Sequence, residues 1–374
     1  MLTRLEIRGY RSLERVKLPL SPLTVVTGGN GTGKSNLYRS LALLSRGARG
    51  ELARALAEEG GMPSALWSGP RRRMGHGPEP VTVFIAVQGE DYGYQFTCGL
   101  PVPSESKFKR DPEVKAELAW LGPLKRTSTT ILERDHGSLH ARAFDGERAH
   151  YPMALDPQET SLSQVIDARR FPDLADLRAR LSSWRFYHHF RCDPDSPLRV
   201  PRPATRTPAL AADGADLAAA LQTITEFGDS EALREAVDRL HPGACLEIED
   251  ADGLGSLEML LHLPGLLRPL RAREFSDGQL RYLALTAALL SPRPGDLLAF
   301  NEPESSLHPD LIPALADLLV RASQESQIWV TTHSETLASA LASATGESPL
   351  CLAVQNGATQ VLGLNGLGER MTDE

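Results

Sequence analysis

The feature that most constrains this chain is the eight-residue segment GGNGTGKS, at residues 28–35. It follows the apolar run LTVVT at 23–27, which predicts a buried strand. It precedes Leu37, Leu41 and Leu44, which recur at helical spacing. The segment thus fits the pattern G-x-x-x-x-G-K-[ST] in the strand, loop and helix context that the pattern requires. An α/β fold is the prediction.

A loop of this composition is suited to holding phosphate groups. Its glycines let backbone N–H groups turn inward around phosphate oxygens, and the positive end of the next helix adds to the attraction. Lys34 would reach the β- and γ-phosphates, and the Ser35 hydroxyl would bind Mg²⁺. The alternative, a glycine-rich turn that binds nothing, does not explain Lys34 and Ser35. The predicted binding residues are Gly28, Gly29, Asn30, Gly31, Thr32, Gly33, Lys34 and Ser35.

Three further segments carry polar residues at the ends of regular elements. FSDGQ at 275–279 begins a predicted helix, and Ser276 is its predicted N-cap residue, at a second anion-binding helix end. An apolar strand leads to Glu302, where a carboxylate can orient or deprotonate water. A second apolar strand leads to His333 in TTHS, where a histidine can donate a hydrogen bond to a phosphate. Each could be an ordinary polar residue at a sheet rim, but their order makes coincidence a poor explanation.

Composition sets broad limits on the kind of protein. With 374 residues the chain can form two domains, or one large domain with an insertion, and 41% hydrophobic and 24% charged residues are ordinary for a globular protein. MLTRLEIRGY reads as an alternating strand rather than a signal peptide, and no apolar run is long enough to cross a bilayer. The four cysteines form no C-x-x-C pair. A soluble, cytoplasmic protein without a zinc ribbon or disulfide framework is predicted.

Taken in order, the four segments resemble the motifs of ABC-type ATPases. They are GGNGTGKS (Walker A), FSDGQ (signature), LLAFNEPESSLHP at 297–309 (Walker B and D-loop) and TTHS (switch histidine). The opening LEIRGYRSLERVKLPLSPLTVVTGGNGTGKSN and the EPE-x-x-LHP pattern are similar, more narrowly, to the RecF-like (AAA15/AAA21) group. That group comprises relatives of DNA-repair and chromosome-maintenance ATPase heads.

The resemblance implies a P-loop ABC-type ATPase head with a mixed β-sheet core and a largely helical inserted lobe. It implies that ATP and Mg²⁺ are held by the 28–35 loop and Asn36, with Ser35 and Asn301 on the metal side. The catalytic residues that it implies are Glu302 as the carboxylate, His333 as the switch histidine and Lys34.

The resemblance also implies a homodimer. In the family, two subunits meet head to tail across a two-fold axis, and each nucleotide is clamped by both. Ser276, Gly278 and Gln279 would face the γ-phosphate bound to the partner subunit. The D-loop at that interface would be Ser305, Ser306 and Leu307.

Asn301 departs from the family pattern, in which the residue before the catalytic glutamate is acidic and supports Mg²⁺. Asparagine keeps an acceptor oxygen of similar geometry but loses the negative charge, so its attraction for the metal should fall. Because Glu302 remains, a slow ATPase is predicted rather than an inactive one. Alternatively, Glu304 or a bound water compensates and the substitution is neutral.

Three segments of different character divide the chain. Residues 1–103 are predicted to form an N-terminal ATPase lobe with Walker A and a β-hairpin at 81–99. Residues 104–243 are predicted to be a mostly helical insertion or lid, with helices in DLADLRARLSSW, GADLAAALQTITEF and SEALREAVDRL. Residues 244–374 are predicted to form a C-terminal ATPase lobe with the signature, Walker B, D-loop and switch histidine.

Two weaker candidates remain. WRFYHHFRCD at 184–193 has metal-binding residue types, but adjacent histidines on a strand point to opposite faces, and Trp184, Phe186, His188 and Phe190 would form a core face. Arginines cluster at 71–73, at 199, 202 and 206, and at 268, 271 and 273. With a formal net charge of -8, the first cluster is best explained as solvated surface, whereas the last lies next to the signature. DNA binding is implied by the resemblance only.

Three functions stay open at this point. The first is an ATP-gated dimer clamp in DNA repair, the DNA damage response or genome maintenance, or in anti-phage defence. Because the chain ends at Glu374, soon after His333, any nuclease or other effector is expected to be a separate partner protein. The second is the nucleotide-binding subunit of an ABC transporter, which the large insertion and the EPE-x-x-LHP pattern disfavour. The third is a nucleotide-gated interaction module with little hydrolysis.

Overall fold

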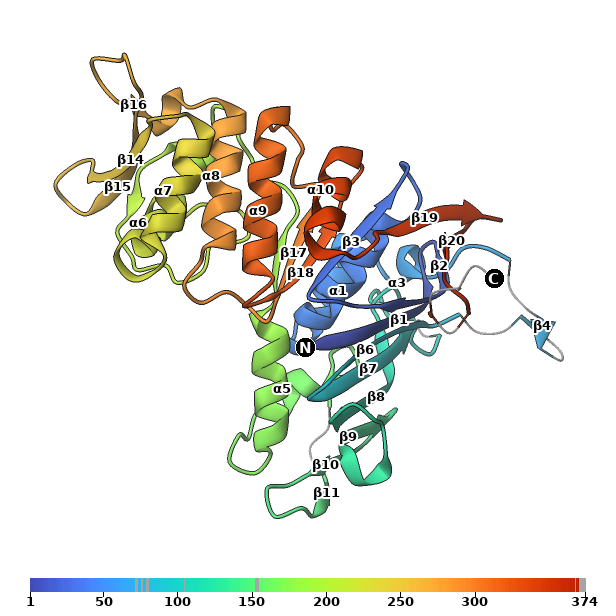
Figure 1. Ribbon diagram of the computed structural model, residues 1–374. Coiled ribbons are helices and arrows are strands. Elements are labelled where there is room, and N and C mark those ends of the chain that lie inside the picture. The colour runs from blue at the N-terminus through green and yellow to red at the C-terminus, as the bar shows by residue number, and fades with distance from the viewer. Residues whose placement is uncertain are drawn as a thin grey trace. The chain divides into compact units, whose positions relative to one another are not determined.

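The computed structural model describes residues 1–70, 73–74, 77–78, 81–103, 105–151, 155–366 and 368–369. The chain forms two compact units. Unit 1 comprises Met1–Ser21, Gly28–Trp184 and Leu350–Glu374, and unit 2 comprises Pro22–Thr27 and Arg185–Pro349. Each unit therefore combines segments that are far apart in the sequence, as the colours in Figure 1 show.

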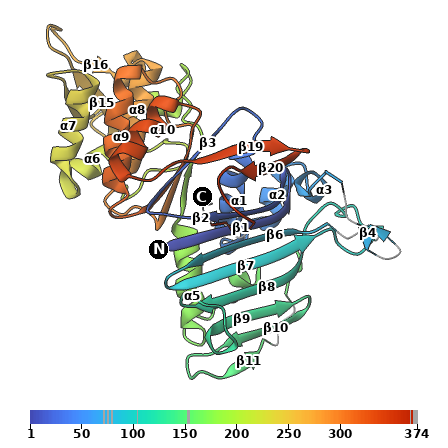
Figure 2. The ribbon, with the colours of Figure 1, turned by 45° about the vertical axis from the view of Figure 1, so that its right-hand side comes forward.

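Unit 1 is built on an eight-stranded antiparallel sheet in the order β11-β10-β9-β8-β7-β6-β1-β2. Figure 2 shows these strands as a fan with helix α5 beside them. In β6, every second side chain is buried, as expected for a sheet with one face on a core. The strands are β1 (Leu2–Tyr10), β2 (Leu13–Pro19), β6 (Val83–Gly89), β7 (Tyr92–Gly99), β8 (Glu113–Leu121), β9 (Thr130–Asp135), β10 (Ser138–Arg142) and β11 (Arg148–His150).

The remaining elements of unit 1 are helices and two short strand pairs. In α1, the predicted helical face of Leu37, Leu41 and Leu44 is buried. The elements are α1 (Lys34–Ala48), α2 (Leu52–Glu58), α3 (Met62–Ala65), α4 (Ser161–Gln164), α5 (Pro172–Ser183), η1 (Thr127–Thr129), β4 (Arg73–Met74), β5 (Gly77–Pro78), β19 (Leu350–Gln355) and β20 (Ala358–Val361).

The structure confirms one prediction about the lobes and corrects another. The hairpin predicted at 81–99 is formed by β6 and β7. The mostly helical segment predicted at 104–243 is wrong for its first part, because residues 113–150 form β8 to β11 and extend the sheet of unit 1. Without a further strand, β7 would have an unpaired edge. The partly alternating segment EVKAELAWL forms β8, which pairs with this edge. The helices predicted after residue 170 are present as α5, α6 and α7.

Unit 2 contains a parallel arrangement of strands in the order β12-β17-β18-β3. All residues of β17 and β18 are buried, as expected for central strands of a parallel sheet. The bounds are β12 (Arg185–Tyr187), β17 (Leu297–Asn301), β18 (Gln327–Thr331) and β3 (Leu23–Gly28), whose residues up to Thr27 belong to this unit.

Helices surround the core of unit 2. Figure 1 shows α6 to α9 side by side, and α8 is buried around its whole circumference from Leu280 to Leu289. No helix in the described residues is long and apolar enough to span a membrane. The bounds are α6 (Leu217–Phe227), α7 (Ser230–Leu240), α8 (Asp277–Leu289), α9 (Ile312–Ala322), α10 (Glu335–Thr345), η2 (Pro197–Arg199), η3 (Ala272–Glu274) and η4 (Pro309–Leu311).

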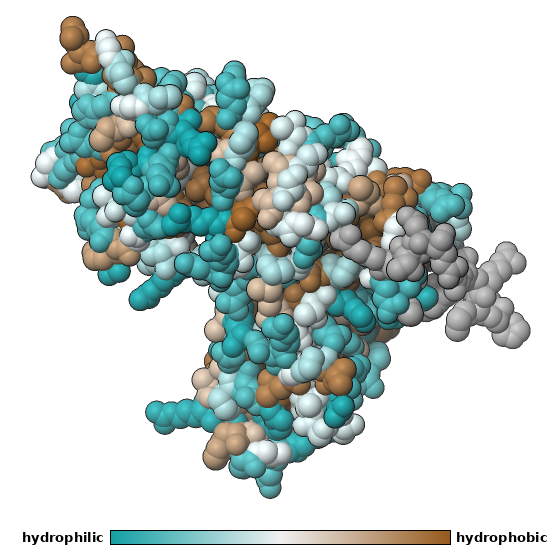
Figure 3. All heavy atoms as spheres, in the orientation of Figure 1, coloured by the Kyte–Doolittle hydropathy of each residue, from teal (hydrophilic) through white to brown (hydrophobic). Residues whose placement is uncertain are grey.

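A second, antiparallel sheet of unit 2 carries two projecting loops. It consists of β13 (Arg202–Pro203), β14 (Cys245–Asp250), β15 (Ser256–His262) and β16 (Leu270–Arg271). Leu254, Leu266 and Leu267 are exposed in these loops, and Figure 3 shows an apolar tip on the loop before β16. Isolated exposed leucines are common on protein surfaces and indicate no particular partner.

Candidate nucleotide site

The 28–35 loop has the backbone conformation that its glycines predict. Gly28, Gly31 and Gly33 all have positive φ, and Gly33, at φ 104°, is the residue before the first turn of α1. Glycine adopts this region without strain, whereas other residues rarely do. The first N–H groups of α1, on Lys34 and Ser35, have no intrahelical acceptor because they belong to the first turn. The loop therefore presents backbone donors at the positive end of a helix, which suits an anion.

Lys34 and Ser35 differ in their exposure. Ser35 is exposed, whereas Lys34 is only 6% exposed. The Lys34 ammonium donates to the carbonyl oxygens of Gly28 at 2.6 Å and Gly29 at 3.0 Å. The lysine side chain thus lies across the 28–35 loop. This is the loop that is predicted to bind the phosphates, which Lys34 is predicted to contact.

A chain of side-chain hydrogen bonds supports the loop from behind. Asn36 Nδ2 donates to Ser12 Oγ at 2.9 Å, and Ser12 Oγ lies 2.7 Å from Thr359 Oγ1. Thr359 Oγ1 donates its only proton to the carbonyl of Thr32 at 2.9 Å, so Ser12 is the donor between the two hydroxyls. Asn36 is therefore held from inside unit 1. No sequence pattern singled out Ser12 or Thr359.

The same pair of hydroxyls explains why residue 33 is glycine. A Cβ added at Gly33 would lie 2.2 Å from Thr359 Oγ1 and 3.0 Å from Ser12 Oγ. Such contacts are too short for a real side chain, and the positive φ adds backbone strain. Gly33 is thus required by packing as well as by its conformation.

In unit 2 the polar residues predicted to be catalytic follow the carboxyl ends of neighbouring parallel strands. Asn301 pairs with Thr331 at the ends of β17 and β18. Beyond them, Glu302 N donates to Thr331 O at 2.8 Å, and Thr332 N donates to Val26 O in β3 at 3.0 Å. The carboxyl edge of an open parallel sheet is the usual place for a ligand. The chain passes from Thr27, at this edge, directly into Gly28.

Glu302 occupies a left-handed turn that Arg281 supports. Its φ is 50°, an unusual value for a glutamate. Arg281, on the second turn of α8, donates to the carbonyl of Glu302 at 2.9 Å and lies 3.3 Å from His189 Nδ1. Burial lowers the pKa of the Arg281 guanidinium, although this group stays charged at any ordinary pH. Arg281, which the sequence patterns did not single out, therefore connects the signature helix to the Glu302 turn.

Glu304 connects the Glu302 turn to the switch histidine. Its side chain is 5% exposed, and its Oε1 accepts from Thr332 Oγ1 at 2.5 Å and from His333 N at 3.3 Å. The His333 ring, 55% exposed, has Nδ1 3.6 Å from Oε1 of both Glu302 and Glu304. The structure thus brings Glu302 and His333 together and adds Glu304 beside the histidine. The EPE spacing was the available signal for Glu304.

Asn301 is buried, and its side chain forms a hydrogen bond within unit 2. Its Oδ1 accepts a hydrogen bond from Thr331 Oγ1 at 2.8 Å. An amide oxygen has two lone pairs, so one acceptor position remains. Glu304, the alternative source of the missing charge, uses its Oε1 to accept from Thr332 and His333, whereas its buried Oε2 has no hydrogen-bond partner among the described residues.

The signature segment begins α8 with a capping box. Gln279 N donates to Ser276 Oγ at 3.2 Å, and Ser276 N donates to Gln279 Oε1 at 2.8 Å. Gln279 Nε2 lies 2.9 Å from His241 Nε2, so this side chain is used within unit 2. Ser276 is exposed and Gly278 partly exposed. A Cβ on Gly278 would lie 3.1 Å from Ser306 O, which places the D-loop residue Ser306, with φ 64°, beside the signature.

Several arginines of the two described clusters contact neighbouring side chains of unit 2. Arg268 donates from Nη1 and Nη2 to the two carboxylate oxygens of Glu274. This pairing lowers the pKa of the Glu274 carboxyl to about 2, below its usual range. Arg271 pairs with Glu258, and Arg206 stacks on Phe227. The side chains of residues 71–73 lie outside the described residues. Arg202, Arg206, Arg268 and Arg273 are exposed, so these contacts neither show nor exclude binding of nucleic-acid phosphates.

The segment 184–193 differs from its prediction. Its strand is only the three residues of β12, and the buried residues are Trp184, Tyr187 and Phe190. Tyr187, rather than Phe186, faces the core because it stacks on Phe300 of the neighbouring strand β17. His188 and His189 are exposed. No cluster of His, Cys, Asp and Glu suited to a metal occurs in the part of the chain that the structure describes.

The residues available for Mg²⁺ are oxygen donors. They are the exposed hydroxyl of Ser35 in unit 1, and the remaining acceptor position of Asn301 and the carboxylate of Glu302 in unit 2. Hydroxyl, amide and carboxylate oxygens, with water, are the donors that this hard cation prefers. Within each unit these donors are too few to hold the ion by protein alone, which suits an ion that is carried on a nucleotide.

Comparison with known families places these features in context. The family model described as "AAA domain, putative AbiEii toxin, Type IV TA system" matches residues 23–339. RecF, the DNA replication and repair protein of Rhizobium meliloti, is 25% identical over 294 residues, which cover 74% of this chain and 69% of RecF. An OLD nuclease of Thermus scotoductus is 46% identical over 44 residues, which are 12% of this chain and only 8% of that nuclease.

Solved structures with a similar fold include heads of SMC proteins. An Smc head bound to the C-terminal winged-helix domain of ScpA has a TM-score of 0.55 at 15% identity, with 96% of this chain and 97% of that chain covered. The Smc head from Pyrococcus furiosus, bound to a ScpA domain, has a TM-score of 0.51 at 14% identity, with 96% and 95% covered. These likenesses concern the fold, and they confirm the predicted ABC-type ATPase head.

Proposed function

Because this chain belongs to the AAA-domain family whose model it matches, we propose that it binds and hydrolyses ATP as a dimer that closes on the nucleotide. The family and the head-like fold support an ATPase of the RecF and SMC type. The single observation that carries the proposal is the 28–35 loop, with left-handed glycines, Lys34 across it and a helix N-terminus at its end.

Within one subunit, the residues divide the work between binding and hydrolysis. Backbone N–H groups of the 28–35 loop and Lys34 would hold the phosphates, and Ser35 and Asn301 are the residues that would bind Mg²⁺, with the help of water. The ion, when bound, neutralises charge on the phosphate oxygens. Glu302 orients and deprotonates the attacking water, and His333, 3.6 Å from Glu302, donates toward the γ-phosphate. Arg281 and Glu304 keep the two residues in place.

The second subunit supplies the signature. Ser276 and Gly278 lie at the N-terminal end of α8, where a hydroxyl and helix N–H groups can bind an anion. Gln279 contributes by closing the capping box, since its side chain is bound to Ser276 and His241. ATP then acts as an adhesive between two copies, and hydrolysis releases them.

The partner side of the proposal rests on the relatives. RecF acts in DNA replication and repair, and OLD is a nuclease, so we propose a role in DNA repair or genome maintenance, in the cytoplasm, with DNA or a separate effector protein as partner. The family description names a putative toxin of a type IV toxin–antitoxin system, which favours anti-phage defence as the second candidate.

A direct test measures ATP turnover and subunit association together. The purified chain is assayed for phosphate release, alone and with single-stranded, double-stranded and broken-end DNA at low salt, and its mass is measured with and without ATP. Turnover together with an ATP-dependent dimer is the expected result. Dimerisation without turnover would replace the ATPase by a nucleotide-gated interaction module. No effect of any DNA would direct the search to a protein partner.

Replacing Asn301 by aspartate should raise turnover. The carboxylate keeps the acceptor for Thr331 and restores the missing charge, so we expect kcat or the affinity for Mg²⁺ to rise roughly 10-fold, by analogy with the loss of an outer metal partner. Turnover is measured over a Mg²⁺ titration. Asn301→Ala is the opposing variant and should lower both. Kinetics of N301D equal to wild type, with unchanged thermal unfolding, would show that the charge does not limit the enzyme.

A further inference from the structure

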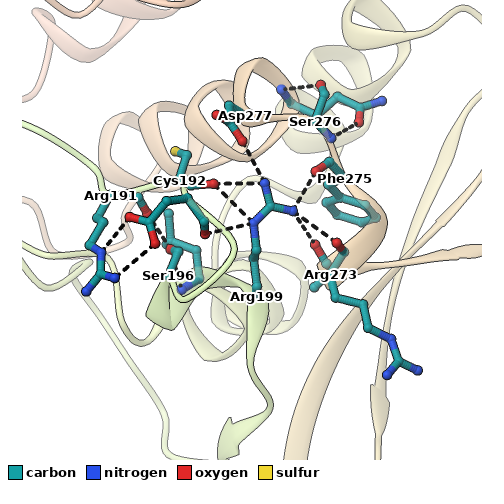
Figure 4. A network of polar contacts seen from close by, with 12 residues as sticks. Arg191, Cys192, Ser196, Arg199, Arg273, Phe275, Ser276 and Asp277 are labelled. Carbon is teal, nitrogen blue, oxygen red and sulfur yellow. Dashed lines mark hydrogen bonds and ion pairs between the residues drawn. The ribbon is translucent and has the colours of Figure 1, made fainter.

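Arg199, at the end of η2, donates hydrogen bonds from all three of its guanidinium nitrogens. Its side chain is only 8% exposed, although the sequence placed it in a cluster of apparent surface arginines. Figure 4 shows its guanidinium at the centre of a polar network that joins the loop at 191–199 to the residues just before α8. The two segments are more than 70 residues apart in the chain.

The guanidinium reaches six acceptors on the two segments. Nε donates to the carbonyls of Cys192 and Asp193, both at 3.1 Å, and Nη2 donates again to Cys192 at 2.8 Å. On the other segment, Nη1 donates to the carbonyl of Phe275 at 2.6 Å and Nη2 to Asp277 Oδ1 at 2.7 Å. Weaker Nη1 contacts complete the set, at 3.1 Å to Arg273 O and 3.5 Å to Ala272 O.

These contacts bracket Ser276. Arg199 holds the backbone carbonyl of the residue before it and the carboxylate of the residue after it. Ser276 is itself the N-cap of α8, and its hydroxyl and the nearby N–H groups form the surface that would meet a phosphate. The direction in which this end of the helix points is therefore set partly by Arg199.

Only an arginine can make this set of contacts. Five of the six acceptors are backbone carbonyls, which belong to two separate segments. The planar guanidinium has five N–H donors and can serve both segments at the same time. A lysine carries three donors on one nitrogen and cannot serve both segments at once. Because Nε, Nη1 and Nη2 all donate to these acceptors, Arg199 has no free N–H group for a DNA phosphate.

We propose that Arg199 is a positioning residue of the signature: it holds the Phe275–Asp277 turn so that Ser276 and the N-terminus of α8 engage the nucleotide of the partner subunit. This inference rests on the proposed ATP-closed dimer. Arg199 does not touch nucleotide itself, and it acts on dimer closure and turnover rather than on the first binding of ATP to a single subunit.

The test compares Arg199→Lys with the matched control Arg202→Lys. Arg202 is exposed, and its side chain makes no hydrogen bond or ion pair with any described residue. For each variant we would measure thermal unfolding, ATP affinity at a protein concentration where the chain is monomeric, ATP-dependent dimerisation and kcat. R199K should lower kcat about 10- to 100-fold, as misplacement of a contacting group by about 1 Å does, and weaken dimerisation. Its monomer affinity for ATP should stay within about twofold, and R202K should resemble wild type.

A second variant separates positioning from folding. Asp277→Asn keeps the five carbonyl contacts and weakens the one charged contact, so it should fold normally and lose part of kcat and dimerisation. If R199K equals R202K in both readouts, the proposal is overturned. It is also overturned if R199K loses monomer binding and folding while D277N behaves as wild type, because Arg199 is then only structural. A wild-type chain that neither dimerises with ATP nor hydrolyses it would instead refute the proposed function.

Discussion

Replacing Glu302 by glutamine is expected to lower ATP turnover by at least about 100-fold, the usual contribution of a general base. Glutamine keeps the size of the side chain but cannot accept the proton of the attacking water. The left-handed turn and the bond from Arg281 to the Glu302 carbonyl involve the backbone, so the variant should fold as the wild type does. ATP binding should persist, and the ATP-bound dimer should accumulate.

Phosphate release and mass measurements with ATP check this expectation. Glu325→Gln is the matched control, since Glu325 is exposed and its side chain has no partner among the described residues. E325Q should behave as wild type. An E302Q chain that hydrolyses ATP at the wild-type rate would remove Glu302 from the catalytic role and make Glu304 the next carboxylate to test.

Replacing Lys34 by alanine should abolish ATP binding at the concentrations at which the wild type binds. A charge-assisted contact is worth up to about 3 kcal/mol, so a loss of about 100-fold in affinity is expected from this group alone. Turnover and ATP-dependent dimerisation should disappear with it. Calorimetry with ATP and Mg²⁺ measures the effect directly.

The controls for Lys34→Ala must separate the loss of a phosphate contact from damage to the 28–35 loop and from the loss of a positive charge in general. Lys34 also donates to the carbonyls of Gly28 and Gly29, so thermal unfolding must show that unit 1 stays intact. Lys125→Ala, at an exposed lysine of unit 1 whose side chain has no described partner, removes the same charge elsewhere. Equal ATP affinity in K34A and K125A would contradict the assignment of the 28–35 loop as the nucleotide site.

The local parts of the structure could be predicted from the sequence. The 28–35 loop, the helix after it and the hairpin at 81–99 each depend on residues close together in the chain. The positions of Glu302 and His333 at the ends of β17 and β18 follow from apolar strands of ordinary length. Strands β8 to β11 were missed because their alternation is irregular and because each depends on pairing with the strand before it, beginning with β8 on β7.

The supporting residues could not be predicted, because their contacts join distant segments. Ser12 and Thr359 are 347 residues apart, yet together they support the 28–35 loop. Arg281 and Arg199 looked like a helix residue and a surface arginine, but burial directs both guanidiniums to backbone carbonyls. A carbonyl acceptor leaves no trace in the sequence, since any residue provides one.

The central claim, that each nucleotide site is shared between two subunits, is tested most directly by mixing two inactive variants. Lys34→Ala disables the 28–35 loop, and Ser276→Arg blocks the exposed signature cap. Each variant alone should lack turnover. A mixed dimer contains one site with an intact loop from one subunit and an intact signature from the other. An equal mixture should therefore recover up to about a quarter of wild-type turnover, the value for random pairing, in which half of the dimers are mixed and each has one working site. A mixture as inactive as its components, from variants that fold as the wild type does, would contradict the shared site.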